Sequence, residues 1–302
     1  MYYTVYGRVF IQYMGGQKIV AVIATCNRSE KLKRIVKNTQ NQTKKTNAII
    51  IIDSSDEINS DFLNIESNKD FRLKYFHTKI KSASKQRNIG IDYCFTELKI
   101  EDDDLILFLD DDLIIPDNYI EKLFNGIKLG FNGISGISIN PNFKVNIATR
   151  ILDIYLFLFG IKTGFKGEVL KSGFTNPVGR RKNEKFIQVS WLICCAMWQA
   201  KFLRGTRFDE FLTGYSLGED VILSTHLKNI KSAKLGVDTT LEFINDSAVT
   251  GKINLIEYDE KVFYMRNKVV ENIGYTSKSI SFKLATIGLK ILRIVRHIKV
   301  SY

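Results

Sequence analysis

Short apolar runs alternate with longer amphipathic stretches over the first 130 residues. Residues 19–24 (IVAVIA) and 48–52 (AIIII) are runs of small and β-branched apolar side chains, as is typical of strands buried on both faces. Between them Leu32, Ile35 and Val36 recur at helical spacing. A strand, a helix and a strand of this length predict a right-handed βαβ unit.

The same alternation continues towards residue 130. Residues 73–76 and 105–109 predict two more strands, and residues 82–95 predict the helix between them. A further helix is expected after Pro116, with apolar residues on one side up to Ile127. Alternating strands and helices predict an α/β fold, with a mostly parallel, Rossmann-like central sheet flanked by helices.

The second half of the chain is less regular. Residues 162–185 are rich in glycine and lysine and are expected to form a long loop. The other predicted elements are strands at 134–139 and 188–197 and helices at 219–227 and 257–272. No linker rich in glycine, serine or proline divides the chain, so we expect one main domain at 19–270, an extension at 1–18 and a helical extension at 271–302.

The composition narrows the classes of partner. The formal net charge is +12 and the pI is about 9.4, which favours a phosphate-bearing partner. Neither zinc-finger spacing nor an aromatic RNA-binding strand is present, so we do not expect a nucleic-acid partner. The four cysteines are irregularly placed, as is typical of reduced thiols. The first 18 residues contain no apolar leader, and no apolar stretch is long enough to span a membrane. These features predict a cytoplasmic protein.

Three consecutive aspartates, Asp110, Asp111 and Asp112, end the apolar run at 105–109. Carboxylates this close repel one another unless a cation offsets their charge. Ligands of open α/β sheets bind at the carboxyl ends of strands, and Mg²⁺ and Mn²⁺ prefer oxygen ligands. Asp110 and Asp112 are two residues apart, so an extended backbone directs both to one side and Asp111 away. The alternative is a solvated acidic turn before the next helix.

Five motifs along the chain then combine into a resemblance. They are Thr25-Cys26-Asn27-Arg28 after the first strand, Asp53 after the second, Arg87-Asn88 in a helix, the string FLDDD, and Phe208-Asp209-Glu210 followed by Gly218-Glu219-Asp220. In this order they resemble the large inverting glycosyltransferase family 2, which has the GT-A fold. The resemblance covers about residues 19–270.

The resemblance implies that residues 19–130 hold a nucleotide-sugar donor, most often one carrying uracil. Thr25 and Arg28 lie where the family's first loop holds the nucleotide, and Asp53 lies where the family binds the base. Arg87 lies where the family approaches the pyrophosphate. From the residues alone, Asp53 could equally begin a turn and Arg87 could be an ordinary helix residue.

The resemblance also implies a metal site, a base and an acceptor half at 131–270. Asp110 and Asp112 match the family's DxD motif, with Asp110 nearer the donor's ribose and Asp112 on Mn²⁺ or Mg²⁺. Asp220 matches the catalytic base, and its neighbour Glu219 is assigned to donor binding. Trp191 lies where the family lines its acceptor pocket. The alternatives are an acidic helix start for the Glu-Asp pair and a core position for Trp191.

Two departures from the family pattern bear on function. The histidine that often supplies a third metal ligand is absent, so Asn245, Asp246 or water is expected to replace it. The Gln-x-x-Arg-Trp motif of processive synthases is missing too, and Arg266 instead precedes Asn267, which favours transfer of a single sugar. A sugar-nucleotide pyrophosphorylase and a non-catalytic membrane-binding protein are the alternative functions, although residues 25–28 lack the glycine that the former needs.

Two segments bear on membranes. Residues 151–161 are apolar but too short to span a bilayer. Residues 282–300 mix basic and apolar positions that partly separate on a helical wheel, as in a helix lying on an anionic membrane surface. The alternative is a helix that packs on the core with its basic side in water. The resemblance favours a glycan or lipid-linked acceptor, met at the cytosolic face of the membrane.

Overall fold

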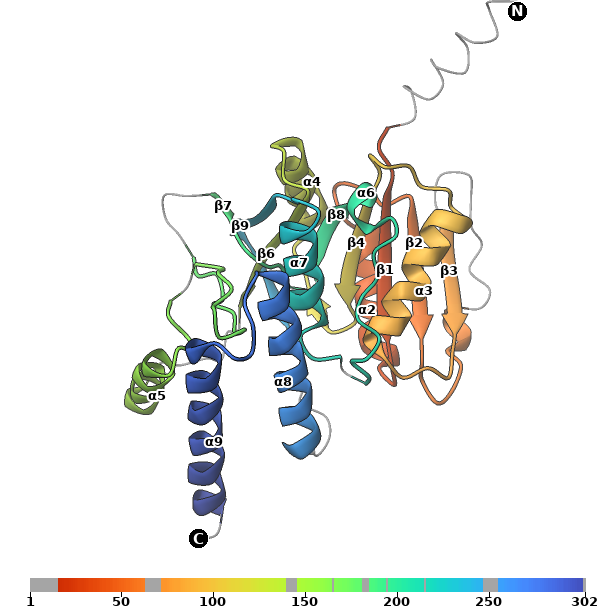
Figure 1. Ribbon diagram of the computed structural model, residues 1–302. Coiled ribbons are helices and arrows are strands. Elements are labelled where there is room, and N and C mark those ends of the chain that lie inside the picture. Colours follow the sequence, from red (N-terminus) through yellow and green to blue (C-terminus); the bar gives the residue numbers. More distant parts are fainter. Residues whose placement is uncertain are drawn as a thin grey trace, which may run out of the picture.

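The computed structural model describes residues 16–62, 72–139, 146–164, 166–180, 185–193, 195–214, 216–246 and 255–300. A central sheet with helices on both faces occupies most of the molecule, and two further helices extend below it (Figure 1). Nine strands form this sheet in the order β3-β2-β1-β4-β8-β6-β9-β5, and β7 also pairs with β9.

The first four long strands form a parallel half-sheet. Its strands are β1 (Ile19–Thr25), β2 (Ala48–Asp53), β3 (Arg72–His77) and β4 (Leu105–Asp110). The apolar runs in the sequence form β1, β2 and β4 because each strand is covered on both faces and needs apolar side chains throughout. Thr25 aligns with Asp53 and Ala24 with Asp110, so the polar residues that end these strands share one edge.

The other half of the sheet is mixed. β8 (Ala196–Gln199) runs antiparallel between β4 and β6 (Gly133–Ile139), and β6 is parallel to β9 (Leu235–Asn245). The two short strands β5 (Leu113–Ile114) and β7 (Phe186–Gln188) pair antiparallel with β9. The sheet as a whole is mostly parallel, as the sequence predicts, and β4, which ends at the aspartates, lies between parallel β1 and antiparallel β8.

Four helices cover the sheet. Side chains of α2 (Ser29–Gln40) and α4 (Tyr119–Lys128) join the core on one face, and those of α3 (Ala83–Thr96) and α7 (Glu219–Asn229) join the core on the other. Gly90 brings α3 close to β1, because a Cβ there would lie 2.4 Å from a methyl carbon of Val22. The remaining elements are the 3₁₀ turn Ser60–Phe62, α5 (Ile147–Leu158), α6 (Ala200–Leu203), α8 (Leu255–Asn272) and α9 (Ile280–Val300).

Helices α8 and α9 are joined to the domain at a buried arginine. Arg266 of α8 is 1% exposed and donates hydrogen bonds to the carbonyl oxygens of Ser172 and Phe282, both at 2.8 Å, and to the hydroxyl of Thr286 at 2.9 Å. These acceptors belong to the loop after α5 and to α9. Arg266, which occurs in this sequence in place of the processive motif, therefore connects α8, α9 and the loop after α5.

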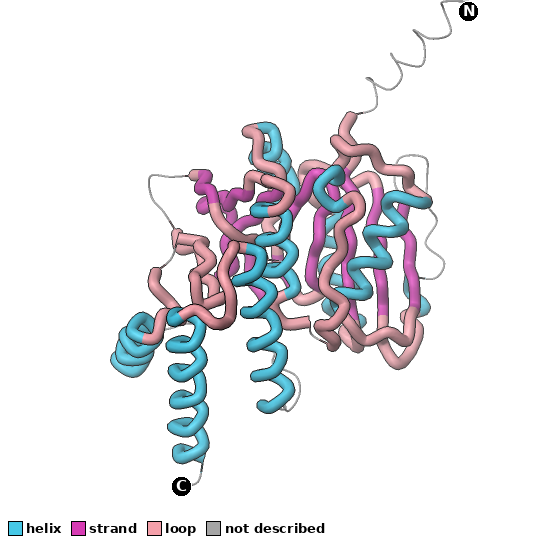
Figure 2. The backbone as a smooth tube through the Cα atoms, in the orientation of Figure 1, coloured by secondary structure: helices cyan, strands magenta, loops and turns pink. Residues whose placement is uncertain are grey.

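The prediction of one continuous strand at 188–197 is wrong. The stretch at 188–197 is interrupted: β7 ends at Gln188, β8 begins at Ala196, and Trp191 lies in the loop between them. The chain must leave β9 and cross to β4 and β6, and a continuous strand could not pair at both places. The described residues of the 162–185 loop contain only isolated bridges, as expected (Figure 2).

The predicted extensions are described only in part. Residues 1–15 of the expected N-terminal extension lie outside the described residues, and the C-terminal helix begins at Ile280 rather than at 271. Within the described part of the chain, no helix has the length and apolar character needed to cross a membrane.

Candidate active site

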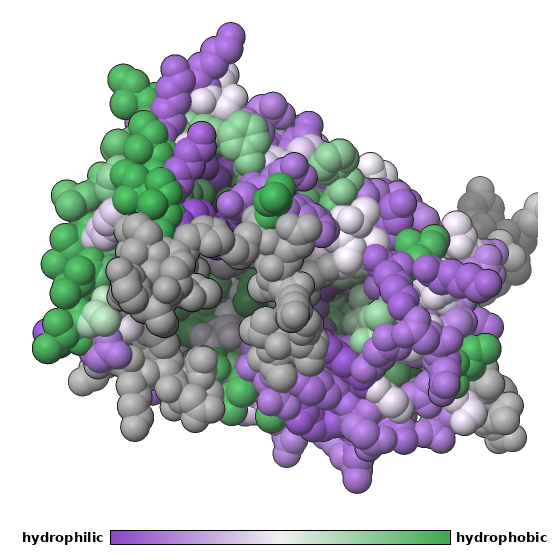
Figure 3. Space-filling model, turned by 90° about the horizontal axis from the view of Figure 1, so that it is seen from below, coloured by the Kyte–Doolittle hydropathy of each residue, from purple (hydrophilic) through white to green (hydrophobic). Residues whose placement is uncertain are grey.

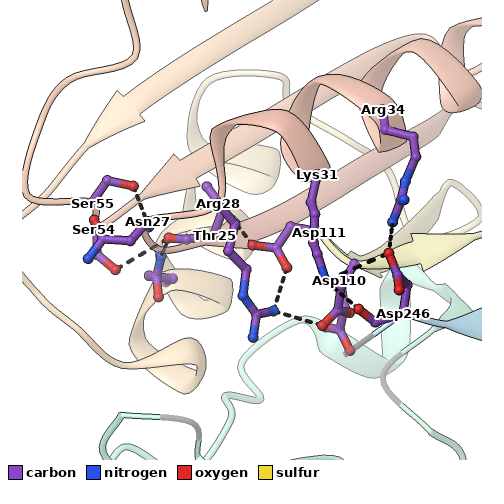
Figure 4. A network of polar contacts seen from close by, with 12 residues as sticks. Thr25, Asn27, Arg28, Lys31, Arg34, Ser54, Ser55, Asp110, Asp111 and Asp246 are labelled. Carbon is purple, nitrogen blue, oxygen red and sulfur yellow. Dashed lines mark hydrogen bonds and ion pairs between the residues drawn. The ribbon is translucent and has the colours of Figure 1, made fainter. Parts of the chain in front are cut away.

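The loops after β1 and β2 are tied to each other. The backbone N–H of Asn27 donates to the Ser55 hydroxyl at 2.7 Å, and the Asn27 amide exchanges two hydrogen bonds with Asp56 (Figure 4). Asn27 adopts a φ of 55°, a left-handed conformation that asparagine tolerates better than most residues. Gln86 of α3 reinforces the edge by donating to the carbonyl oxygens of Thr25 and Ile52 at 2.8 and 2.7 Å.

Asp53 is 2% exposed at the end of β2. One carboxylate oxygen accepts from the backbone N–H and the hydroxyl of Ser55, and the other accepts from the Tyr75 hydroxyl at 2.8 Å. Burial is the main cause that raises the pKa of Tyr75 to about 12, so Tyr75 donates at neutral pH. Asp53 thus starts a turn, the alternative reading of the sequence, while its binding of a nucleotide base stays a prediction.

Arg28 lies between two of the three aspartates. Its Nη1 atom is 2.9 Å from Asp111 Oδ1 and 2.7 Å from Asp112 Oδ2, and the Thr25 hydroxyl donates to Asp111 Oδ2 at 2.7 Å. The expectation that Asp111 points away from the site is therefore wrong. β4 ends at Asp110 and the chain turns at 111–112, so the alternation of an extended strand no longer decides where Asp111 points.

Burial of this carboxylate cluster disfavours the ionised form of its members. Asp111 and Asp112 are each 4% exposed, and burial is the main cause that raises the pKa of both. Asp110 raises them further through its negative charge, while Arg28 acts in the opposite direction. The guanidinium of Arg28 contacts both buried carboxylates, and its positive charge favours their ionised forms.

A second arginine joins Asp110 to the helix that carries the predicted base. Arg87 of α3 is 4% exposed, and its Nη2 and Nη1 atoms lie 2.5 Å from Asp110 Oδ1 and from Glu219 Oε1. Asp110 ends β4 and Glu219 begins α7, so one side chain connects three elements. Here Arg87 pairs with carboxylates; its approach to a pyrophosphate stays a prediction.

Asp220 occupies the first turn of α7. Gly218 precedes this turn with a φ of +83°, and a Cβ there would lie 2.5 Å from Met265 Cγ, so the position requires glycine. The half-buried Asp220 carboxylate accepts a hydrogen bond from the backbone N–H of Val221 at 2.8 Å. Burial raises the pKa of Asp220 to about 6; Asp110 adds to the rise, and Arg87 opposes it.

The oxygen donors at the edge suit a hard divalent cation. Asp110 and Asp112 supply carboxylate oxygens, and the raised pKa of buried Asp112 indicates a position that a cation would stabilise. Within the described ranges, no group of three His, Cys, Asp or Glu side chains is arranged to hold a metal ion. Asp110 and Asp112 therefore fit the metal in donor type, with the remaining ligands left to substrate or water.

Asp246, one candidate for the absent histidine, lies next to this cluster. Its backbone N–H donates to the carbonyl oxygen of Asp112 at 2.9 Å, because β9 pairs with β5 directly after the aspartates. Its carboxylate pairs with Arg34 of α2 at 3.0 Å and lies 3.7 Å from Lys31 Nζ (Figure 4). Asp246 thus lies beside Asp112, and a ligand role for Asp246 or Asn245 stays a prediction.

Trp191 lies against the core on the α7 side. Its indole N–H donates to the carbonyl oxygen of Asn176 at 3.0 Å, and its ring packs against the cluster formed by Leu212, Val221, Ile222, Met265 and Val269. The core contact that the sequence left open is therefore present. A role in binding the acceptor stays a prediction.

Asn88 is the site residue whose role sequence reasoning missed. Its amide nitrogen donates to the Phe208 carbonyl at 3.0 Å and to Glu210 Oε1 at 2.9 Å, and its oxygen accepts from the Phe208 N–H at 2.8 Å. Asn88 thereby fixes the Phe-Asp-Glu segment beside Arg87. Its place directly after Arg87 in the motif is the signal that could have suggested this link.

The amino-acid sequence matches one protein family over much of its length. The family described as glycosyl transferase family 2 matches residues 20–186, which is more than half of the chain. The chain belongs to glycosyl transferase family 2. It is accordingly a glycosyltransferase, and neither a sugar-nucleotide pyrophosphorylase nor a non-catalytic membrane protein is needed to explain its motifs.

A curated relative and several solved structures of glycosyltransferases are similar to this family 2 chain. Poly(ribitol-phosphate) beta-N-acetylglucosaminyltransferase TarP of Staphylococcus aureus is 30% identical over 113 residues. The aligned segment covers 36% of this chain and 32% of that relative, so this chain matches about a third of its length.

Structure comparison supports the fold. TarS 1-349 of S. aureus in complex with UDP has a TM-score of 0.56 at 12% identity, covering 90% of this chain and 71% of that one. TarS 1-349 with UDP-GlcNAc has a TM-score of 0.52 at 11% identity, covering 87% and 74%. GalNAc-T7 with UDP, GalNAc and Mn²⁺ has a TM-score of 0.53 at 14% identity, covering 90% and 54%. This family 2 chain therefore has the predicted GT-A fold.

Proposed function

We propose that this enzyme transfers one sugar from a uridine-diphosphate sugar to a hydroxyl of a glycan or lipid-linked acceptor, with inversion at the anomeric carbon. The observation that carries the proposal is the connection from Asp110 through Arg87 to Glu219. Asp110, at the end of β4, is close enough to Asp220 for its negative charge to raise the pKa of Asp220. Inverting transfer needs these two parts together, a group that holds the leaving diphosphate and a base for the acceptor.

Asp220 is the proposed base. Its pKa of about 6 leaves it mostly ionised at neutral pH while keeping it basic enough to take the acceptor proton. It lies in the first turn of α7 and remains partly exposed, so an acceptor hydroxyl can approach it. In the proposed step Asp220 takes the hydroxyl proton, the acceptor oxygen bonds to the anomeric carbon, and the bond from that carbon to the diphosphate breaks.

The donor is proposed to lie along the edge formed by the loops after β1, β2 and β4. Thr25, Arg28, Asp53 and Asp110 are the proposed donor contacts there, with Arg87 and Glu219 behind them. Mn²⁺ or Mg²⁺ held by Asp110 and Asp112 would neutralise charge on the diphosphate. Arg28 pairs with Asp111 and Asp112. A cation at the carboxylates would take over its role as counter-ion, and Arg28 would then be available to the diphosphate.

The comparisons support a choice of donor and acceptor. TarP is named as an N-acetylglucosaminyltransferase and TarS is solved with UDP-GlcNAc, so UDP-N-acetylglucosamine is the donor to test first. TarP acts by its name on poly(ribitol-phosphate), and a net charge of +12 suits an acceptor that carries phosphates. We therefore propose a phosphate-rich surface polysaccharide, or its lipid-linked precursor, as the acceptor class.

Release of UDP tests the proposal. The protein is incubated with Mn²⁺ and, in separate reactions, with UDP-N-acetylglucosamine, UDP-glucose, UDP-galactose and a GDP-sugar, each with and without a polyol-phosphate acceptor. We expect acceptor-dependent UDP release from one UDP-sugar and loss of that release in excess EDTA. Turnover of the GDP-sugar alone, measured as release of GDP, would contradict the proposed donor, and turnover that is unchanged in EDTA would contradict the proposed metal.

A further inference from the structure

Helix α9 presents an apolar stripe to solvent. Ile280, Leu284, Ile287, Ile291 and Ile294 are between 38% and 85% exposed. Their spacing of four, three, four and three residues places them on one face of the helix. An isolated exposed isoleucine is ordinary on a protein surface, but five in one row form a continuous surface that needs an occupant.

Helix α5 carries a matching stripe. Ile147, Ile151, Ile154 and Leu158 follow the same spacing and are 62% to 79% exposed. None of the twelve residues of α5 is buried, so this helix puts most of its apolar surface into solvent. Seen from below, green side chains cover the side of the molecule where α5 lies (Figure 3). These four residues and the five of α9 are called the α5–α9 surface below.

The two helices are held together on their inner sides. The Tyr155 hydroxyl at the end of α5 donates to the carbonyl oxygen of Gly288 in α9 at 2.7 Å. A Cβ at position 288 would lie 2.6 Å from the ring of Phe159, so glycine allows the close approach. Phe282 and Ala285 of α9 are buried on the opposite side from the stripe. The core therefore needs the inner side of α9 and leaves the outer side uncovered.

Charge indicates what covers the α5–α9 surface. The sequence of α9 contains no acidic residue, and Lys283 and Lys290 are exposed beside its stripe. In α5 the single acidic residue, Asp153, is paired with Lys162 at 2.7 Å. A second copy of this chain would bring the same positive charge to this surface, whereas anionic lipid headgroups supply the opposite charge. Apolar stripes flanked by lysines are typical of helices that lie in a bilayer interface.

We infer that α5 and α9 dock this enzyme onto an anionic membrane surface, with both stripes at the boundary between headgroups and acyl chains. The sequence suggests such a surface for the C-terminal helix alone; the structure adds α5 and makes the docking element a pair. Both helices lie on the side towards which the carboxyl ends of the parallel strands point (Figure 1). Docking thus keeps the enzyme at the bilayer surface, and the use of this position for membrane-borne acceptors rests on the proposed function.

Flotation with lipid vesicles tests the inference. The full chain is mixed with vesicles of phosphatidylcholine alone or with phosphatidylglycerol, at low and high salt. We expect binding to the anionic vesicles that weakens at high salt. The double variants Ile287→Glu/Ile291→Glu and Ile151→Glu/Ile154→Glu should each lower the partition coefficient at least tenfold. Lys290→Ala should lower it about fivefold.

Ile230→Glu is the matched control, because Ile230 is 62% exposed but lies after α7, outside the α5–α9 surface. This variant should bind vesicles as the unaltered chain does. Absence of vesicle binding by the unaltered chain, or equal binding by the stripe variants, would overturn the inference. The inference would also be overturned if the chain did not bind vesicles and instead formed a dimer that the stripe variants dissociate. A second copy of the chain would then cover this surface. UDP release measured with a soluble acceptor tests the proposed function separately.

Discussion

Arg87 and Glu219 lie 2.5 Å apart, with only 5% and 8% of their side chains exposed. They come from α3 and α7, and Arg87 also pairs with Asp110 at the end of β4. Burying an arginine between two carboxylates carries a desolvation penalty, and the attraction between the charges offsets that penalty only while all three groups stay together. The edge of the sheet and the start of α7 are therefore held by charge as well as by apolar packing.

Replacing Arg87 tests this connection. Arg87→Met removes the counter-ion and leaves Glu219 and Asp110 unpaired, so we expect a loss of about 3–5 kcal/mol in the free energy of unfolding. Urea denaturation at pH 7 measures the change. Arg204→Met is the control, because the pair of Arg204 with Asp102 is about half exposed and its loss should cost below about 1 kcal/mol. Equal losses in the two variants would contradict the proposed importance of the buried pair.

The base assignment predicts a kinetic change and a pH dependence. Asp220→Asn should lower kcat about 10²- to 10⁴-fold with little change in donor affinity, because the proton acceptor is lost but the donor contacts remain. In the unaltered enzyme, activity should fall as the pH drops through about 6, since Asp220 then becomes protonated. Initial rates of UDP release from pH 5 to 8 check both. Asp92→Asn, an exposed carboxylate paired with Arg207, should leave kcat unchanged.

Stability should respond to Asp220 in the opposite direction from activity. A carboxyl group whose pKa is raised in the folded state favours folding when protonated, and its ionised form opposes folding as the pH rises from about 4 through about 6. Asp220→Asn removes that ionisation, so its Tm at pH 7.5 should equal or exceed the Tm of the unaltered enzyme. At pH 4 the two should converge. A variant that is less stable at pH 7.5 would show that the carboxylate is needed for folding.

Arg28 should compete with a metal for the aspartates. Arg28→Met leaves Asp111 and Asp112 without their shared cation, so we expect a lower Tm in EDTA. Mn²⁺ should then raise the Tm of this variant more than that of the unaltered enzyme, because the carboxylates gain a missing counter-ion. Thermal-shift measurements over a Mn²⁺ titration check this. Adding Asp112→Asn should reduce the gain, and an unchanged gain would place the metal elsewhere.

Arg266 predicts how α9 is attached. Arg266→Met leaves the carbonyl oxygens of Ser172 and Phe282 without this donor, so we expect a loss of about 2–4 kcal/mol in unfolding free energy. The control is Arg293→Met, which removes a partly exposed pair between α9 and Asp259. Limited proteolysis should release the C-terminal helix faster in the first variant only. Equal rates would mean that packing alone holds α9.

Much of the parallel half-sheet could be predicted because its signals are local. Strands buried on both faces need continuous apolar runs, and the polar residues that end them, Asp53 and Asp110, mark the shared carboxyl edge. The helix after Ser82 was predictable for the same reason: its hydroxyl caps the helix by accepting from the Lys85 N–H.

The features that could not be predicted depend on contacts between distant residues. Arg87 and Glu219 are 132 positions apart, and nothing near either one specifies the other. The direction of Asp111 depends on where β4 ends, and directly after that end β5 pairs with the distant strand β9. The apolar neighbours of Trp191 predict a strand, but Trp191 lies in a loop and packs against residues of α7 and α8.

The arrangement around Arg87 also makes two chemical events interdependent. Asp110 and Asp220 influence each other's charge, since Asp110 raises the pKa of Asp220. A ligand that offsets the charge of Asp110 must therefore make Asp220 a stronger acid, and by the reciprocity of coupled equilibria an ionised Asp220 must favour that ligand. An enzyme built this way links cation binding beside Asp110 to the proton on Asp220, so that a cation bound there would favour the ionised base.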